Sequence, residues 1–272
     1  MAAQDLRLAN GTVYFHSAET MKELKEKSVR FAFGSPPFTN HPDGKTLDKT
    51  DYLEFIDRVY GEVFRVLVPG GVLVTLNTDS RDHKEYNRGD SSFEGTVWHK
   101  SYAIRQRCER LGFKCFDQRV WVHSEKINLY RYTFSTILFL SKPGAPVLHA
   151  YSNKGAPGFR QHAWIVEDSM QRRDSSGVIF RDAIHPEIVK RCVDEFSRKG
   201  DLVLSPFVGS GTVCAVAERM QRPWVGYEVD PKRRRVIEES VTSDDNDFSR
   251  LLSAASGGGD VAAKPTARRA RK

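Results

Sequence analysis

Two short segments of this sequence carry residues whose types and spacing suit chemistry on a bound molecule. The first is FVGSGT, the glycine loop (residues 207–212), which lies between the apolar run DLVL and a helical pattern. A glycine-rich turn from a strand into a helix brings backbone N–H groups and a helix N-terminus close to a ligand. Glu228 ends the next apolar segment, WVGYE, where a carboxylate can accept two hydrogen bonds from a ribose diol. Together these features favour a cofactor of the adenosine type over a helix cap with a surface glutamate.

The second segment is GSPPF, the proline loop (residues 34–38), which ends another apolar run. Pro36 and Pro37 fix the backbone and lack N–H groups, so they form a rigid rim of carbonyl acceptors. Ser35 adds a hydroxyl to this rim, and Phe38 adds an aromatic ring. Such a rim suits a planar ring with an exocyclic amine, because the two amine protons need two acceptors and the ring can stack on Phe38. Without the glycine loop, a proline-stiffened turn would be the better interpretation.

Alternating strand and helix patterns must position these two loops. Strand patterns cover residues 13–15, 29–34, 72–76, 113–122, 132–140, 201–204 and 224–227, and helix patterns cover residues 18–27, 52–67, 101–111, 186–197 and 211–220. This alternation is typical of an α/β domain with a mostly parallel sheet. An irregular stretch is expected from Pro143 to about Asp182. Ligands of open α/β sheets bind at the carboxyl ends of the strands, where both loops are expected.

The composition is that of an ordinary globular protein and excludes wholesale disorder. Hydrophobic residues make up 39% and charged residues 28% of the 272 positions. The 42 Lys and Arg exceed the 35 Asp and Glu, and this net charge of +7 is compatible with a polyanionic partner without establishing one. No apolar run reaches about 18 residues and no signal peptide is evident, so we expect a cytoplasmic protein without a membrane span. The four cysteines form no C-x-x-C pair, which argues against a zinc ribbon or a redox dithiol, and we expect reduced thiols rather than a disulfide framework and no metal site.

Together the two loops resemble those of the amino-group DNA methyltransferases that use S-adenosylmethionine. In that family S/D/N-P-P-Y/F is the catalytic loop and F-x-G-x-G is the cofactor loop, and here they read SPPF and FVGSGT. The similarity covers nearly all of residues 5–235, and the catalytic loop comes first, as in the circularly permuted beta class. The resemblance implies a Rossmann-like methyltransferase fold in residues 1–240, with a mostly parallel seven-stranded sheet and helices on both faces. The permuted order places the strands that end at Gly34 and Leu204 side by side.

The resemblance also implies an activity, a cofactor and a substrate. The expected enzyme transfers a methyl group from S-adenosyl-L-methionine to an exocyclic amine of a DNA base that is flipped out of the duplex. Serine before the prolines resembles the cytosine-N4 members, whereas Asp or Asn is more usual in adenine-N6 members. We therefore expect cytosine N4 as the target and keep adenine N6 as the alternative, with an RNA base as a further one. The sequence leaves open the target site, a place in a restriction-modification system and the oligomeric state, a dimer included.

The resemblance assigns site residues one by one. The implied catalytic residues are Ser35, Pro36, Pro37 and Phe38, and the implied cofactor-binding residues are Ser205, Pro206, Phe207, Gly209, Ser210, Gly211, Thr212, Glu228, His16 and Ser17. The sequence departs from the family pattern in two segments. Ser205 replaces the usual Asp, so it offers the cofactor's ammonium group only a neutral hydrogen bond. His16 and Ser17 stand where Gly-Asp is usual, so an adenine-binding acid is missing. These departures keep a catalytically weak nucleic-acid-binding relative as an alternative.

Three further segments are candidates for contacts with DNA. Residues 143–182 and 80–100 are polar stretches with several Lys and Arg that can bind phosphates. The alternative interpretation is that both are ordinary solvated loops. Residues 241–272 hold a triple glycine and five positive charges among the last nine residues, which predicts a flexible basic tail. A nicotinamide-dependent oxidoreductase would share the glycine loop and the ribose acid. It would not explain SPPF or the order of the two loops.

Overall fold

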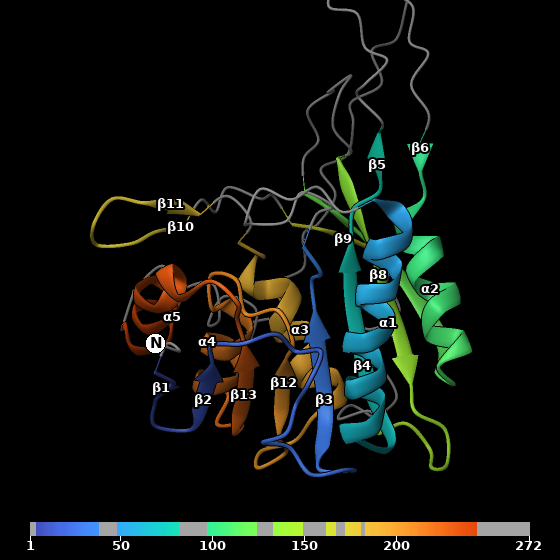
Figure 1. Ribbon diagram of the computed structural model, residues 1–272, viewed down its shortest axis with the longest axis horizontal. Helices are drawn as coiled ribbons and strands as arrows, with labels where there is room; N and C mark the ends of the chain where they lie inside the picture. Colours follow the sequence, from blue (N-terminus) through green and yellow to red (C-terminus); the bar gives the residue numbers. More distant parts are fainter. Residues whose placement is uncertain are drawn as a thin grey trace, which may run out of the picture.

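A nine-stranded sheet forms the middle layer of the protein (Figure 1). The computed structural model describes residues 4–37, 48–81, 97–123, 133–148, 162–166, 172–180 and 183–243. The order in the sheet is β1-β2-β13-β12-β3-β4-β8-β7-β9. These strands are β1 (Leu6–Arg7), β2 (Gly11–Tyr14), β3 (Val29–Gly34), β4 (Leu67–Asn77), β7 (Lys114–Val122), β8 (Phe134–Ser141), β9 (Ala163–Ile165), β12 (Val203–Ser205) and β13 (Trp224–Tyr227). Two short antiparallel pairs lie outside the sheet, β5 (Ser80–Arg81) with β6 (Val97–Trp98) and β10 (Arg172–Arg173) with β11 (Ile179–Phe180).

The strand order confirms the predicted α/β fold with permuted order. The neighbours β2, β13, β12, β3 and β4 are parallel, and β8 runs antiparallel to both β4 and β7. These seven strands form the expected sheet, in which β3 lies beside β12 although the two are far apart in sequence. The sheet has nine strands rather than seven because one short strand is added at each edge. β1 pairs antiparallel with β2, and β9 pairs parallel with β7.

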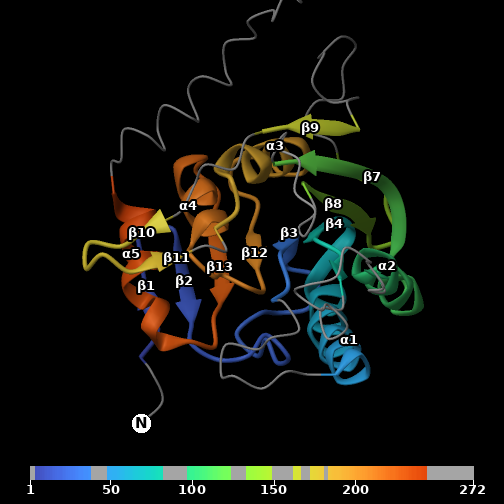
Figure 2. The same cartoon turned by 90° about the horizontal axis from the view of Figure 1, so that it is seen from above.

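Helices cover both faces of the sheet, as predicted (Figure 2). On one face lie α1 (Lys49–Val66) and α2 (Lys100–Arg110). On the other face lie α3 (Pro186–Phe196), α4 (Thr212–Arg219) and α5 (Arg234–Thr242). The short helix η1 (Pro231–Arg233) directly precedes α5. Side chains of β3 alternate between the two layers. Phe31 and Phe33 pack in the cluster with α3, α4 and α5, and Ala32 packs in the cluster with α1 and α2. This alternation follows from the two-residue period of a strand and explains why Phe31, Ala32 and Phe33 are all apolar.

Side chains from outside α1 satisfy backbone groups at both of its ends. The helix begins at Lys49 because the carboxylate of Asp48 accepts hydrogen bonds from the N–H groups of Thr50 and Asp51, at 2.7 and 2.9 Å. The predicted start, Tyr52, was therefore three residues too late. At the other end the Lys142 ammonium donates to the carbonyls of Phe64, Arg65 and Leu67, at 2.6, 3.3 and 2.8 Å. This satisfies carbonyls that have no partner inside the helix.

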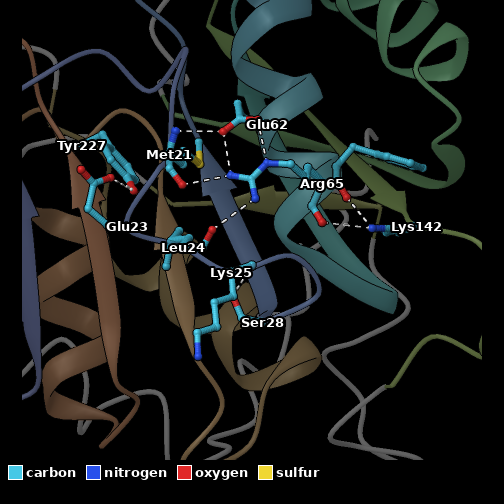
Figure 3. Close-up of polar contacts among 10 residues, drawn as sticks. Met21, Glu23, Leu24, Lys25, Ser28, Glu62, Arg65, Lys142 and Tyr227 are labelled. Atoms are coloured by element: carbon cyan, nitrogen blue, oxygen red, sulfur yellow. Dashed lines mark hydrogen bonds and ion pairs between the residues drawn. The ribbon is translucent and has the colours of Figure 1, made fainter.

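The helix predicted over residues 18–27 is wrong. This segment forms a series of turns, because α1 binds its backbone groups through two side chains (Figure 3). The Arg65 guanidinium donates to the carbonyls of Met21 and Leu24, at 2.9 and 3.2 Å. Glu62 accepts from the N–H of Met21 at 2.8 Å and pairs with Arg65. Tertiary hydrogen bonds therefore replace the helical ones that the local pattern favoured.

Several other expectations fall on residues that are described only in part. The stretch from Pro143 to Asp182 is not wholly irregular, since β9, β10 and β11 lie within it. The helix α5 continues past residue 240, and residues 244–272 lie outside the described part of the chain.

The four cysteines are free thiols. Within the described residues, no helix has the length and apolar character that crossing a membrane requires.

Candidate functional site

The proline loop and the glycine loop meet at one edge of the sheet. They follow β3 and β12, which pair in parallel with Phe31 opposite Val203 and Ala32 opposite Leu204. A Cβ atom added to Gly34 would lie 3.4 Å from Cγ of Pro206. The strand β13 ends at the same edge next to β12, and β2 ends there next to β13. The sequence predicted this meeting of the loops, and the strand register brings it about.

The glycine loop is braced on one side and open on the other. Gly211 has φ +87°, and a Cβ atom there would lie 3.0 Å from Cα of Ile237 in α5, so a side chain does not fit. Gly209 has φ +59°, but the nearest atom to its added Cβ is Nη1 of Arg233, at 3.9 Å. The hydroxyl of Ser240 donates to the carbonyl of Ser210 at 2.8 Å and ties the loop to α5. The backbone at Gly209 therefore faces space that a ligand can approach.

Glu228 joins the glycine loop to the end of β13. Its side chain is buried, and its two carboxylate oxygens accept hydrogen bonds from the N–H groups of Gly209 and Asp230, at 2.8 and 3.0 Å. Burial raises the pKa of Glu228, while the Asp230 N–H and the charge of Arg233 act in the opposite direction. Each carboxylate oxygen has a second lone pair, so the group can still accept hydrogen bonds from a bound molecule.

Ser205 carries a buried hydroxyl at the end of β12. The residue is 1% exposed, and its Oγ has no hydrogen-bond partner among the described residues. A buried polar atom without a partner is costly unless water or a ligand satisfies it.

The ring of Phe207 lies against Phe55 and Tyr60 of α1, with centroid distances of 6.0 and 6.2 Å. Phe207 therefore anchors the glycine loop to α1, and Ser205 offers a polar atom beside it.

The other predicted cofactor residues are engaged with their neighbours. Ser210 and Thr212 are buried, and their hydroxyls lie 3.3 Å apart. His16 follows β2, and its Nε2 lies 3.1 Å from a carboxylate oxygen of Glu23. The hydroxyl of Ser17 donates to Glu19 at 2.8 Å. His16 and Ser17 thus lie at the correct edge of the sheet, and their contact with a cofactor stays a prediction.

Ser35, Pro36 and Pro37 of the proline loop are described, whereas Phe38 lies outside the described residues. Pro36 is buried, and Ser35 and Pro37 are half-buried. The Pro37 carbonyl accepts a hydrogen bond from the Tyr52 hydroxyl at 3.0 Å. Among the described residues, no hydrogen bond engages the Ser35 hydroxyl or the Pro36 carbonyl. These two acceptors are therefore available to a bound amine.

The sequence analysis did not identify a group of residues that packs around Tyr52 and Tyr60 of α1, next to the proline loop. The Tyr52 ring packs edge-on against Trp98, with centroids 5.6 Å apart, and the Lys100 ammonium lies 5.9 Å from the Tyr52 ring centroid. The hydroxyl of Tyr60 lies 2.7 Å from that of Thr75. The available signal was a pair of tyrosines on a predicted amphipathic helix, because a buried tyrosine hydroxyl needs a partner.

Lys100 makes the free energy of unfolding of the protein depend on pH. It is 3% exposed, and burial lowers its pKa to about 8, against the attraction of Asp79. Between pH 8 and about 10.4 the unfolded lysine holds a proton that the folded one has released, so this group raises stability as the pH rises through that window. We expect Lys100→Met to remove the rise, by up to about 3 kcal/mol across the window. Denaturant unfolding at several pH values measures it.

Lys49 is the matched control for this measurement, because it is exposed and lies near Trp98, with its ammonium 5.8 Å from the ring centroid. Lys49→Met should leave the pH dependence of unfolding as it is in the wild type. If Lys100→Met gave a curve parallel to that of the wild type, the pKa of Lys100 would not be lowered in the folded protein, and the pH dependence would have another origin.

Comparison with known proteins places the chain in a family. Residues 29–239 match the N6/N4 methyltransferase family, described as DNA methylase. The Type II methyltransferase M.Cfr9I of Citrobacter freundii is 32% identical, over 93% of this chain and 94% of its own length. TTHA0409 of Thermus thermophilus, assigned as a DNA modification methylase and solved with S-adenosyl-L-methionine, is 26% identical with a TM-score of 0.63, over 88% of this chain and 93% of its own. The cytosine-N4-specific PvuII DNA methyltransferase shares the fold, with a TM-score of 0.71 at 16% identity over 90% of this chain and 91% of its own.

Proposed function

This chain belongs to the N6/N4 DNA methylase family, and we propose that it transfers a methyl group from S-adenosyl-L-methionine to the exocyclic N4 amine of cytosine in DNA. The observation that carries the proposal is the meeting of the proline loop and the glycine loop at one sheet edge. There Ser35 and Pro36, whose acceptors have no hydrogen-bond partner among the described residues, follow the strand that pairs with β12. The serine before the two prolines supports cytosine as the target base.

The residues of the glycine loop fit S-adenosyl-L-methionine. The open space at Gly209 admits a ligand close to the backbone, and Glu228 keeps lone pairs for ribose hydroxyls. The unsatisfied hydroxyl of Ser205 suits a polar group of the methionine end. When bound, the cofactor supplies a methyl group that its sulfonium makes electrophilic. The TTHA0409 structure with S-adenosyl-L-methionine supports the same assignment.

The proline loop would make the target amine a better nucleophile. The lone pair of an aromatic amine is delocalised into its ring, which weakens it as a nucleophile. We expect the Ser35 hydroxyl and the Pro36 carbonyl to accept hydrogen bonds from its two N–H groups, which favours a tetrahedral nitrogen with a localised lone pair. The loop contributes orientation and electrostatic stabilisation, and no covalent bond to the base is needed. A carbon-5 methyltransferase would instead need a thiolate, and the sequence has no Pro-Cys pair.

DNA is the expected macromolecular partner, with the target base flipped out of the duplex. The candidate contact segments are residues 80–100 and 143–182 and the basic tail, 241–272, and most of their residues lie outside the described part of the chain. Within residues 143–182, the β10–β11 pair carries Arg172 and Arg173. Ser205 in place of Asp supports a second candidate function, a nucleic-acid-binding relative with weak catalysis, since the acid would pair with the cofactor's ammonium group.

Nucleoside analysis tests the proposal. The protein is incubated with methyl-labelled S-adenosyl-L-methionine and DNA of mixed sequence, or RNA in a parallel sample, and the digest is separated and identified by mass. We expect label in N4-methyldeoxycytidine. Label in N6-methyldeoxyadenosine would overturn the cytosine assignment and keep the amino-methyltransferase activity. If the protein binds both the cofactor and DNA but transfers no label to any base, the weak relative is the better description.

A further inference from the structure

The end of the proline loop is held by a tyrosine of α1. The hydroxyl of Tyr52 donates to the carbonyl of Pro37 at 3.0 Å. Tyr52 is 1% exposed, and its ring packs nearly perpendicular to that of Trp98, at an angle of 82°. Burial raises the pKa of Tyr52, so the hydroxyl keeps its proton and remains a donor at neutral pH. The Pro37 carbonyl therefore has a permanent partner within the protein.

The start of the loop is held by a second tyrosine of the same helix. A Cβ atom on Gly34 would lie 3.1 Å from the hydroxyl oxygen of Tyr60, so this hydroxyl is packed against the last residue of β3. It pairs at 2.7 Å with the hydroxyl of Thr75, which is the residue opposite Gly34 in the β3–β4 register. Asn77 donates from its side-chain amide to the Thr75 hydroxyl at 3.2 Å. Tyr60 and Thr75 are fully buried, so this contact is fixed by packing on all sides.

Tyr60 also connects the two loops. Its ring lies 6.2 Å from the ring of Phe207 at an angle of 66°, and Phe207 belongs to the glycine loop. The neighbouring Pro206 is the other contact of Gly34, at 3.4 Å from the added Cβ. Tyr52 and Tyr60 lie on one rigid helix with capped ends. The distance between Gly34 and Pro37 of the proline loop is therefore set by α1 and not by the proline loop itself.

We propose that Tyr52 and Tyr60 are positioning residues that clamp the proline loop at its end and its start. The inference rests on the proposed function, in which Ser35 and Pro36 supply the two acceptors for the amine. Tyr52 occupies the Pro37 carbonyl, so the amine meets one carbonyl acceptor, that of Pro36, and the Ser35 hydroxyl. Tyr60 fixes Gly34 beside the glycine loop, so the amine is held at a constant place relative to the cofactor. Small displacements of reacting groups cost large factors in rate, which is why a clamp matters here.

Tyr52→Phe tests the clamp, because it keeps the ring and removes only the hydroxyl. We expect the single-turnover rate of methyl transfer at saturating DNA to fall about 10-fold or more, with the affinity for S-adenosyl-L-methionine unchanged. The amide hydrogens of Gly34 and Ser35, the two residues of 34–37 that have an N–H, should exchange faster with solvent. Tyr60→Phe should act in the same direction. Tyr102→Phe is the matched control, since Tyr102 is 59% exposed on α2 and accepts a hydrogen bond from Gln106.

The two readouts separate failure of the clamp from failure of the proposed function. If Tyr52→Phe kept the wild-type rate, or if its lower rate came with an equal loss of cofactor affinity, the clamp would be wrong. If the wild type methylated no base, the proposed function would fail, and hydrogen exchange would decide on the clamp alone. Unchanged exchange at Gly34 and Ser35 in Tyr52→Phe would then contradict it.

Discussion

Ser35→Ala should lower the single-turnover rate of methyl transfer by about 10²–10³-fold, because it removes one of the two acceptors proposed for the target amine. Ser35 is half-buried, and no hydrogen bond engages its hydroxyl among the described residues, so its loss leaves none of those residues without a partner. The Pro36 carbonyl remains and can still accept a hydrogen bond from one N–H of the amine. The affinity for S-adenosyl-L-methionine should barely change, since we assign the cofactor to the glycine loop. Rapid quenching at saturating DNA measures the rate, and a titration measures the affinity.

Ser28→Ala is the matched control for this measurement. Ser28 lies just before β3, at the opposite end of the strand that leads to Ser35, and its hydroxyl is exposed and donates to the carbonyl of Lys25. This variant should keep the wild-type rate. Ser35→Thr, which keeps the hydroxyl, should recover part of the rate if the added methyl group fits. A wild-type rate in Ser35→Ala would show that the serine has no part in catalysis and that the proline pair is a structural turn.

The two loops that we propose to approach the ligand could be located in the sequence because their signals are local. A glycine loop or a proline pair sets its own backbone conformation, and a strand ending just before it fixes which edge of the sheet it lies on. Gly211 is an example, since its φ of +87° and its contact with Ile237 require a glycine. The side-by-side placement of β3 and β12 came from the family resemblance, because no local pattern records which strands pair.

The residues that hold the two loops in place could not be predicted, because their partners lie far away in the sequence. Tyr52 and Tyr60 show only a helical period in the sequence, and their partners Pro37 and Thr75 each lie 15 positions away. The failed helix over residues 18–27 has the same cause, since the contacts of Arg65 with Met21 and Leu24 span 44 and 41 positions. The edge strands β1 and β9 have two and three residues, which is too short for a period of two to be visible.

Glu228→Ala should weaken the binding of S-adenosyl-L-methionine by about 2–4 kcal/mol, or roughly 30- to 700-fold, if its carboxylate binds the ribose. The structure adds a second effect, which is the bracing of the glycine loop. The same carboxylate accepts hydrogen bonds from the N–H groups of Gly209 and Asp230. Removing it leaves those donors unpaired and loosens the glycine loop. Glu228→Gln keeps the size of the side chain and one acceptor, so it separates the two effects better than alanine. Thermal unfolding without cofactor measures the bracing contribution alone.

A cycle with a modified ligand isolates the ribose contact itself. The affinities of S-adenosylhomocysteine and its 2′-deoxy analogue are measured for the wild type and for Glu228→Gln. In the wild type the deoxy analogue should bind more weakly, because one hydroxyl no longer meets the carboxylate. In Glu228→Gln most of this difference should disappear, since a double cycle cancels any general loosening of the loop. If the full difference persisted in the variant, Glu228 would act only as a brace between β13 and the glycine loop, and another group would bind the ribose.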